Sequence, residues 1–429
     1  MVQRCSRRAA LKSAMAAFGA VIGAAAFQPR TTQAAAVRAG RLLVPGYRSG
    51  MAEIGGRPVT DLPGVNQVPS NWNGRRAMLS MLDLADPTGQ PRRVVLPTRG
   101  HGTIPGSPTQ PGVFVGMECG SIAGFDPDSL GLVAIGVPRR DGWLIGGHGV
   151  RLPGGAYVAI SERAPPSPAS GNLAADVVRL EGRIVIRDAA TLKPVDDFPS
   201  YGIRPHQIEL TEDGRYLVVA NYGSTAAEGD GPEDYFAPST ILAPCIAVIE
   251  TASGRLVERI AGANPEVELR HLVAPRLDRI FVITARLDYV GAGDTQDDPE
   301  APDGLRYVEA RPVRVEGGRA VRLLSEQAHL TRHGLSLGYH AATDAVLMAF
   351  PGTHTIAVLD GATAAVRKLI DTAALGLHWP CGLAPTPDGR RWLVTGYWRG
   401  VLTLRSEDWR MEVASPLPQW WGHSHTVMA

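Results

Sequence analysis

Four side chains that can bind a metal recur at one fixed distance ahead of a turn. Each lies seven residues before a turn residue: His148 before Gly155, His206 before Asp213, His271 before Asp278, and Cys381 before Asp388. A β-rich run follows each turn, as in Leu217-Val218-Val219-Ala220. This repeated hairpin constrains the fold more than any other feature, because equal phase gives equivalent positions in successive units.

A second hairpin follows each first one, as in Cys245-Ile246-Ala247-Val248-Ile249-Glu250. Two hairpins make a four-strand unit, and an all-β chain with such a period is typical of a propeller. We therefore predict an all-β fold, a seven-bladed β-propeller. The predicted units are residues 41–97, 99–140, 143–200, 201–262, 266–325, 333–372 and 376–416. Two β-sandwiches, the alternative, would not keep one phase from residue 148 to residue 388.

Some features have a structural interpretation. Asp188, Glu250 and Asp360 end their strands, and we expect their carboxylates to accept backbone N–H bonds in the turns. The Asp-, Glu-, Gly- and Pro-rich segments 224–244 and 286–304 are expected to be surface insertions between strands. The acidic residues of the second segment do not have EF-hand spacing, so it is interpreted as a solvated loop.

The N-terminus predicts export. Ser6-Arg7-Arg8-Ala9-Ala10-Leu11-Lys12 matches the twin-arginine pattern, an Ala-rich apolar stretch follows, and Ala34-Ala35-Ala36 offers a cleavage site. We expect residues 1–36 to be a twin-arginine (Tat) signal peptide and residues 37–429 the propeller domain, located in the periplasm. No other stretch approaches the roughly 18 apolar residues of a membrane span, so none is expected in the mature chain.

Charge and cysteine content exclude several classes. The net charge is +1, from 43 basic and 42 acidic residues, which predicts no nucleic-acid partner. Cleavage after residue 36 would leave three cysteines, an odd number, and therefore at least one free thiol. Cys245 lies in an apolar run and is expected in the core.

Several short motifs occur together in a fixed order: Arg99-Gly100-His101-Gly102, Gly147-His148-Gly149, Gly202 to Ile208, Val219 to Gly223, Arg270-His271-Leu272, and Cys381-Gly382-Leu383. On these motifs the chain resembles the bacterial domain-of-unknown-function family 1513 over most of residues 95–400. The resemblance implies a Tat-exported, seven-bladed propeller with YVTN-type repeats, similar in shape to the quinoprotein amine dehydrogenase β-chain. It implies no particular activity. Gly116 to Gly120 and Asn221 to Ser224 depart from the family pattern, so a ligand specific to the family could differ here.

The histidines give the functional hypothesis. The first strand of a propeller blade lines the central channel, so His148, His206 and His271 are expected to converge near its axis, with His101 joining from the preceding blade. Neutral imidazoles and a thiolate suit copper, zinc or iron, and we expect copper or iron. The predicted ligands are therefore His101, His148, His206, His271 and Cys381. Capping of turns by single histidines, and a buried structural role for Cys381, are the alternatives.

The other histidines do not share this phase, and they are expected to have lesser roles. His333, His340 and His378 are out of phase, and Leu337 stands at the corresponding position of the sixth unit. His423 and His425 could close over the channel mouth, but a solvated tail is preferred. Glu162 and Asn221 are candidate partners that would fix histidine tautomers.

The sequence does not specify an activity. It contains no P-loop, no dinucleotide fingerprint and no C-x-x-C-H, so neither a nucleotide cofactor nor covalent haem is expected. Whether the protein is an enzyme stays open. Three functions are compatible: a periplasmic metal-binding propeller, a ligand-free module that docks a periplasmic protein partner, and a metal-assisted hydrolase of the propeller-lactonase kind.

Overall fold

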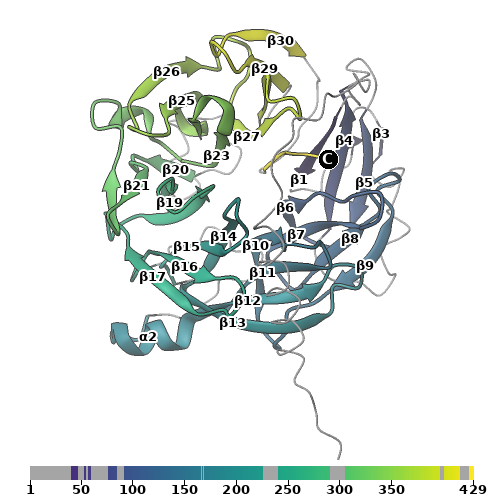
Figure 1. Cartoon of the computed structure of the whole chain (residues 1–429), viewed down its shortest axis with the longest axis vertical. Helices are drawn as coiled ribbons and strands as arrows, with labels where there is room; N and C mark the ends of the chain where they lie inside the picture. The colour runs from purple at the N-terminus through teal and green to yellow at the C-terminus, as the bar shows by residue number, and fades with distance from the viewer. Residues whose placement is uncertain are drawn as a thin grey trace, which may run out of the picture.

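The structure is a computed structural model, and it describes residues 40–46, 53–54, 57–58, 76–84, 91–165, 167, 169–225, 240–289, 305–396, 401–415 and 425–429. Within these ranges the chain is mostly β, and its sheets are arranged radially around a central axis (Figure 1). The expectation of a predominantly β fold is confirmed. The predicted signal segment lies outside the described residues.

Most sheets are separate meanders of about four strands. One is β14 (Pro205–Leu210), β15 (Tyr216–Asn221), β16 (Cys245–Glu250) and β17 (Leu256–Ala261). Another is β18 (Glu268–Val273), β19 (Phe281–Tyr289), β21 (Val313–Glu316) and β22 (Arg319–Arg322), with β20 (Leu305–Val308) paired to β19. The next two are β23 (Ser336–His340), β24 (Ala345–Phe350), β25 (Thr355–Asp360) and β26 (Val366–Asp371), then β27 (Pro380–Pro385), β28 (Arg391–Gly396), β29 (Val401–Arg405) and β30 (Met411–Ser415).

One larger sheet has eight strands, because β7 also pairs with β10. Its strands are β6 (Gly100–Ile104), β7 (Gly112–Cys119), β8 (Ile122–Phe125), β9 (Leu132–Gly136), β10 (Leu144–Arg151), β11 (Tyr157–Arg163), β12 (Glu181–Asp188) and β13 (Pro194–Ile203). The short helix α2 (Leu173–Leu180) lies between β11 and β12. A two-stranded ribbon, β2 (Glu53–Ile54) with β3 (Arg57–Pro58), stands apart.

The remaining sheet joins both ends of the described chain. Its order is β31 (Val427–Met428), β1 (Arg41–Gly46), β4 (Ala77–Asp83) and β5 (Arg92–Leu96). The sequence units did not include β31. Its two residues are too few to show an alternating pattern, and its partner strand lies at the other end of the sequence.

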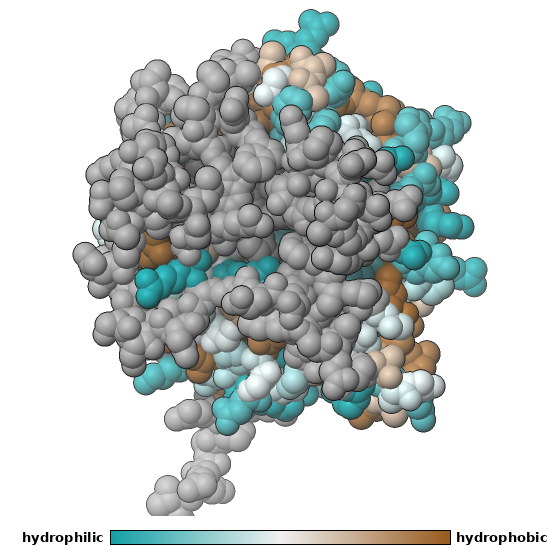
Figure 2. All heavy atoms as spheres, turned by 180° about the vertical axis from the view of Figure 1, so that it is seen from behind, coloured by the Kyte–Doolittle hydropathy of each residue, from teal (hydrophilic) through white to brown (hydrophobic). Residues whose placement is uncertain are grey.

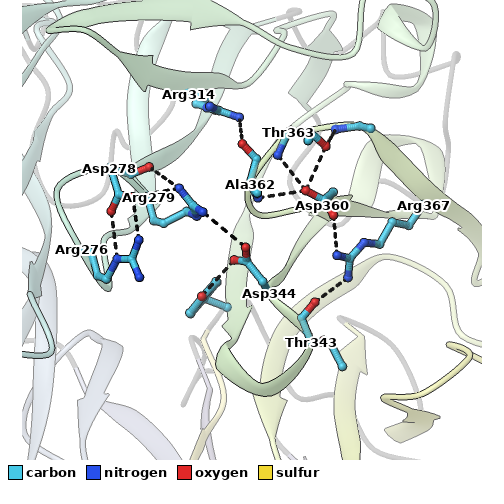
Figure 3. A network of polar contacts seen from close by, with 12 residues as sticks. Arg276, Asp278, Arg279, Arg314, Thr343, Asp344, Asp360, Ala362, Thr363 and Arg367 are labelled. Carbon is cyan, nitrogen blue, oxygen red and sulfur yellow. Dashed lines mark hydrogen bonds and ion pairs between the residues drawn. The ribbon is translucent and has the colours of Figure 1, made fainter.

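Apolar side chains fill the space between neighbouring sheets. One core cluster, for example, packs Val218 and Val248 of one sheet against Leu272 and Val282 of the next. Polar contacts add to this packing at the outer turns: Arg314 donates to the carbonyl oxygen of Ala362 at 2.7 Å (Figure 3). Where described residues are visible from behind, hydrophilic and hydrophobic residues are mixed along the edge of the molecule (Figure 2).

The turn prediction holds for two of its three residues as stated. Asp188 accepts from the backbone N–H groups of Ala190 and Thr191, and Asp360 does the same from Ala362 and Thr363. Glu250 instead accepts from the hydroxyl group of Ser253.

The two long connections differ in outcome. Segment 224–244 joins neighbouring strands β15 and β16, as expected, although residues 226–239 lie outside the described residues. Residues 286–289 are a correction: they extend β19 and pair with β20, so they are strand rather than loop. Residues 290–304, including the acidic ones, lie outside the described residues.

The structure also tests the predictions for the cysteines and for membrane-spanning helices. Cys119, Cys245 and Cys381 are all buried free thiols, and Cys245 lies in the core as predicted. Among the described residues, no helix is both long and apolar enough to span a bilayer.

Candidate metal centre

The first strands of four consecutive units bring four histidines to one place. His101 lies in β6, His148 in β10, His206 in β14 and His271 in β18, and these strands contact one another in sequence around the axis. One potential ligand atom from each histidine lies within 4.8 Å of the corresponding atoms of the other three, and all four residues are buried. We refer to these four residues as the histidine cluster.

A β-bulge accompanies each member of the cluster. The pairing register shifts between Gly100 and Gly102, between Ile145 and Gly149, between Pro205 and Ile208, and between Leu269 and His271. A bulge inserts an extra residue into a strand and redirects its side chain. The four histidines therefore share both their distance from the following turn and a β-bulge. We attribute the inward direction of their imidazoles to these two features together.

Two nitrogen–nitrogen distances come close to the spacing of metal ligands and are also in the range of N–H···N hydrogen bonds. Nε2 of His206 lies 2.8 Å from Nε2 of His271 and 3.2 Å from Nε2 of His101. Metal–nitrogen bonds of about 2.0–2.1 Å place tetrahedral ligand nitrogens roughly 3.3 Å apart. Small adjustments of these side chains would allow all four to share one ion.

The backbone fixes the tautomer of His206. Its Nδ1 lies 2.6 Å from the carbonyl oxygen of Gly146, which can only accept, so we assign the proton to Nδ1. The Nε2 lone pair then faces the other histidines. Metal-bound histidines commonly donate their second N–H to a backbone carbonyl in this way.

Two further nitrogens of the cluster lack partners. Nε2 of His148 and Nδ1 of His271 are buried without a hydrogen-bond partner among the described residues. A buried polar atom left in this state costs free energy. Coordination of an ion by Nε2 of His148 would remove one such cost, so the residues fit a metal.

Burial keeps three histidines of the cluster neutral. The pKa values of His148, His206 and His271 lie well below the usual histidine range, mainly because burial disfavours the charged imidazolium. Neighbouring histidines and the guanidinium groups of Arg163 and Arg270 add to the effect. Neutral imidazoles are the form that ligates metals.

A charged layer lies beside His206. Nη2 of Arg163 is 2.9 Å from Nδ1 of His206, but both atoms are N–H donors in the tautomer set by the shorter contact with Gly146, so this contact is not a hydrogen bond. Arg163 forms an ion pair with Glu118. Arg204 pairs with the same carboxylate. Burial alone would raise the pKa of Glu118, but Arg204, Arg163 and Arg99 hold it at about 2. Glu118 is therefore an anion that holds two arginines beside the cluster.

The backbone is strained where this layer forms. Glu118 and Arg204 have φ angles of 50° and 53°, in the left-handed region that side chains other than glycine rarely adopt. Each such residue costs about 1–3 kcal/mol. These two residues also form the ion pair beside the cluster. Strained residues of this kind are often found at functional sites.

The ring of Tyr222 contacts both the histidine cluster and nearby arginines. The ring of Tyr222 is 4.6 Å from that of His206, and the guanidinium carbons of Arg163 and Arg270 lie 4.6 Å and 5.3 Å from its centre. These are cation–π distances. Burial raises the pKa of Tyr222 to about 12, so the phenol stays neutral.

The remaining predicted ligand lies elsewhere. The thiol of Cys381 is 3.8 Å from the hydroxyl of Thr395 and packs with Leu335 and Trp379, outside the histidine cluster. Cys381 shares the phase of the histidines, but the structure does not bring its thiol into the group that the four histidines form.

His425 lies beside the cluster although the sequence did not place it there. The sequence predicts a solvated tail at this position, whereas the ring of His425 lies 4.2 Å from that of His271. His423, its neighbour in the sequence pattern, lies outside the described residues.

The expected tautomer partners are also corrected. Glu162 forms an ion pair with buried Arg187, and Asn221 donates to the carbonyl oxygen of Ser200. The carbonyl group of Gly146 takes the place predicted for them at His206. Of the histidines out of phase, His340 bonds to the carbonyl oxygen of Gly389, which is a structural contact.

Sequence reasoning missed Glu118, Arg163, Arg204 and Tyr222, and it ranked the channel-mouth position of His425 below a solvated tail. The sequence does contain a pattern that could have identified Arg204. An arginine precedes His101, His206 and His271 by one or two residues, and Arg204 is the one before His206. Glu118 and Arg163 carry no comparable mark.

Comparisons with known proteins agree with the fold. The family described as "Protein of unknown function (DUF1513)" matches residues 94–427. No curated protein matches the chain significantly.

Solved structures share the architecture at low sequence identity. Hydrazine synthase of Kuenenia stuttgartiensis has a TM-score of 0.53 and 16% identity over 85% of this chain and 100% of that chain. The periplasmic gluconolactonase PpgL of Pseudomonas aeruginosa gives 0.54 and 14%, over 91% of this chain and 99% of that chain. A putative 6-phosphogluconolactonase of Bacteroides fragilis gives 0.52 and 11%, over 93% and 100%. At such identities these likenesses establish a propeller-like fold and no activity.

Proposed function

Because the chain belongs to the DUF1513 family, whose function is not known, we propose a function from the site itself: the protein binds a transition metal through His101, His148, His206 and His271. The observation that carries the proposal is the convergence of Nε2 atoms on His206, whose lone pair faces the cluster.

The chemistry of the ligands narrows the ion. Imidazole nitrogen suits copper, iron, zinc and nickel, whereas calcium and magnesium prefer oxygen. The candidate group contains no carboxylate, so calcium and magnesium are disfavoured. We propose copper or iron. When bound, such an ion supplies a Lewis acid or a one-electron redox centre.

The protein's own residues would prepare the site for this ion. The carbonyl group of Gly146 orients His206, and burial keeps three of the imidazoles unprotonated. Arg163 and Glu118 form an ion pair on the Nδ1 side of His206. The two alternative functions gain no specific support, because the lactonase likeness concerns the fold alone and no partner surface is indicated.

Metal content tests the proposal. Protein purified from cells without a metal-chelating column should carry about one copper or iron per chain. The double variant His206→Ala, His271→Ala should carry at least ten-fold less. His329→Ala changes an exposed histidine and is the matched control. Wild-type protein without stoichiometric metal, or a double variant with the same load, would contradict the proposal.

We also propose seven propeller blades. The eight-stranded sheet consists of two consecutive four-strand meanders, β6–β9 and β10–β13, joined by the pairing of β7 with β10. Counting these as two blades brings the total to seven. An experimental structure with a regular six- or eight-fold arrangement would contradict this count.

Export to the periplasm is the last part of the proposal. It rests on the twin-arginine pattern at Arg7 and Arg8, which lies outside the described residues. Replacing both by Lys should leave the precursor in the cytoplasm, and cell fractionation measures this. Unchanged export of the variant would remove this part and leave the metal proposal intact.

A further inference from the structure

The strand β31 brings a fifth histidine to the cluster. Val427 and Met428 pair with Leu43 and Leu42 of β1. Two backbone hydrogen bonds between Arg41 and Ala429 extend this pairing. His425 lies two residues before the strand, so its position depends on this pairing. We call residues 425–429 the strap.

His425 contacts the cluster from one side. Its ring centre lies 4.2 Å from that of His271, 4.7 Å from that of His148 and 4.9 Å from that of His101. His206 contacts the same three rings, at 4.7, 4.6 and 5.0 Å. No ring contact joins His206 to His425. The three shared histidines therefore lie between His206 and His425.

Ser336 fixes the tautomer of His425. The Ser336 hydroxyl donates to the carbonyl oxygen of Cys381, which can only accept. The Ser336 oxygen lies 2.8 Å from Nδ1 of His425 and is left to accept, so Nδ1 of His425 carries the proton. The lone pair of His425 is then on Nε2. This nitrogen is buried and has no hydrogen-bond partner in the described part of the chain.

This arrangement parallels that of His206. In both residues Nδ1 donates to an oxygen supplied by an inner strand, and Nε2 is left with its lone pair. Ser336 begins β23, the first strand of its sheet, and β23 supplies no histidine to the cluster. His425 of the strap therefore adds an imidazole at the sheet that does not supply one itself.

We infer that His425 is a further metal ligand and that the strap holds it against the histidine cluster, on the side opposite His206. This rests on the proposed function. An ion held by His425 binds only the form in which β31 is paired with β1, so binding stabilises that pairing by linkage. The packing of the strap agrees, since Thr426 is 5% exposed and lies against Gly382 of β27.

Cu²⁺ titration of metal-free protein tests the inference. Wild-type protein should bind one ion, with a rise in Tm. His425→Ala should bind at least ten-fold more weakly, show a smaller rise in Tm and give an altered Cu²⁺ electron paramagnetic resonance spectrum. Ser336→Ala keeps His425 but removes the hydroxyl that accepts from its Nδ1–H, so the tautomer is no longer fixed. This variant should bind about ten-fold more weakly. His329→Ala is the control and should match wild type.

The outcomes separate the two proposals. Wild-type protein that binds no Cu²⁺ overturns the proposed function and this inference with it. Wild-type binding, with the affinity and spectrum unchanged in folded His425→Ala, overturns this inference alone. If His425→Ala fails to fold, Ser336→Ala decides: unchanged binding counts against the inference, and weakened binding with an altered spectrum supports it.

Discussion

Individual side chains in this centre gain their roles from neighbours that fix them. His206 would be an ordinary buried histidine if the carbonyl oxygen of Gly146 did not hold its Nδ1 proton. Cys381 shares its phase with the histidines but packs against Trp379. Phase in the sequence therefore identified candidate positions, and only the local contacts distinguish a ligand from a core residue.

Gly147 makes the approach of the histidines geometrically feasible. Its φ is +111°, and a Cβ atom there would lie 2.7 Å from Cε1 of His206 and 3.1 Å from Cδ2 of His101. Both imidazoles would have to move. We predict that Gly147→Ala weakens metal binding at least ten-fold, since displaced ligands lose their common centre.

Backbone strain alone could also affect a variant of this kind, and Gly154→Ala controls for it. Gly154 has a φ of +82°, but nothing lies within 4 Å of a Cβ built there. Both variants should lose about 1 kcal/mol or more of stability, while only Gly147→Ala should lose metal, as measured by Cu²⁺ titration. Equal metal affinity in the two variants would show that the contact with His206 and His101 is unimportant.

At the scale of strands and turns, the sequence was most informative where a local pattern fixes the structure. The unit boundaries and the turns at Asp188 and Asp360 follow from alternation and side-chain hydrogen bonding, which act over a few residues. The bulges that aim the histidines were not predicted. A bulge depends on the opposite strand, and the sequence of one strand does not specify it.

Asp360 illustrates how one turn supports two sheets. It accepts three hydrogen bonds, from the N–H groups of Ala362 and Thr363 and the hydroxyl of Thr363, and forms an ion pair with Arg367 (Figure 3). Arg314 of the neighbouring sheet bonds to the carbonyl oxygen of Ala362 in the same turn.

We predict that Asp360→Ala lowers the free energy of unfolding by about 1–2 kcal/mol, the usual effect of losing a side chain that satisfies backbone N–H groups. Urea denaturation measures this. Metal affinity should stay at the wild-type value, because the turn is at the outer end of its sheet. Glu326→Ala, at an exposed position, is the matched control. A loss no larger than that of the control would contradict a structural role for Asp360.

At the scale of the whole molecule, the contacts that complete the centre connect distant parts of the sequence. Ser336 and His425 are separated by 89 residues, and Arg204 and Glu118 by 86. Sequence patterns predicted which strands meet at the axis, since that follows from repetition. They could not predict the pairing of β31 with β1 or the Glu118 ion pairs, which depend on closure of the whole ring.

The buried centre also gives the metal-free protein a characteristic pH dependence. His148, His206 and His271 have lowered pKa values when folded and about 6.5 when unfolded, so below pH 6.5 the unfolded chain binds protons that the folded chain does not. Stability must then fall as the pH falls. Glu209 opposes this, because burial raises its pKa to about 7 and the folded chain holds its proton between about pH 4.5 and 7.

Burial also lowers the pKa of His425 to about 3, which makes four histidines, and it raises the pKa values of Glu162 and Glu181 as it does that of Glu209. The histidines outnumber the carboxyl groups by about one to three protons. We therefore predict that the free energy of unfolding falls by roughly 1–4 kcal/mol per pH unit between pH 6.5 and 5. Urea denaturation of metal-free protein at several pH values measures the slope. Glu209→Gln should make it steeper by about 1.4 kcal/mol per pH unit, and His206→Ala should make it shallower by the same amount. Glu118, with a pKa of about 2, acts only at lower pH. A stability that stays constant or rises as the pH falls from 6.5 to 5 would show that the histidines are not held neutral in the folded protein.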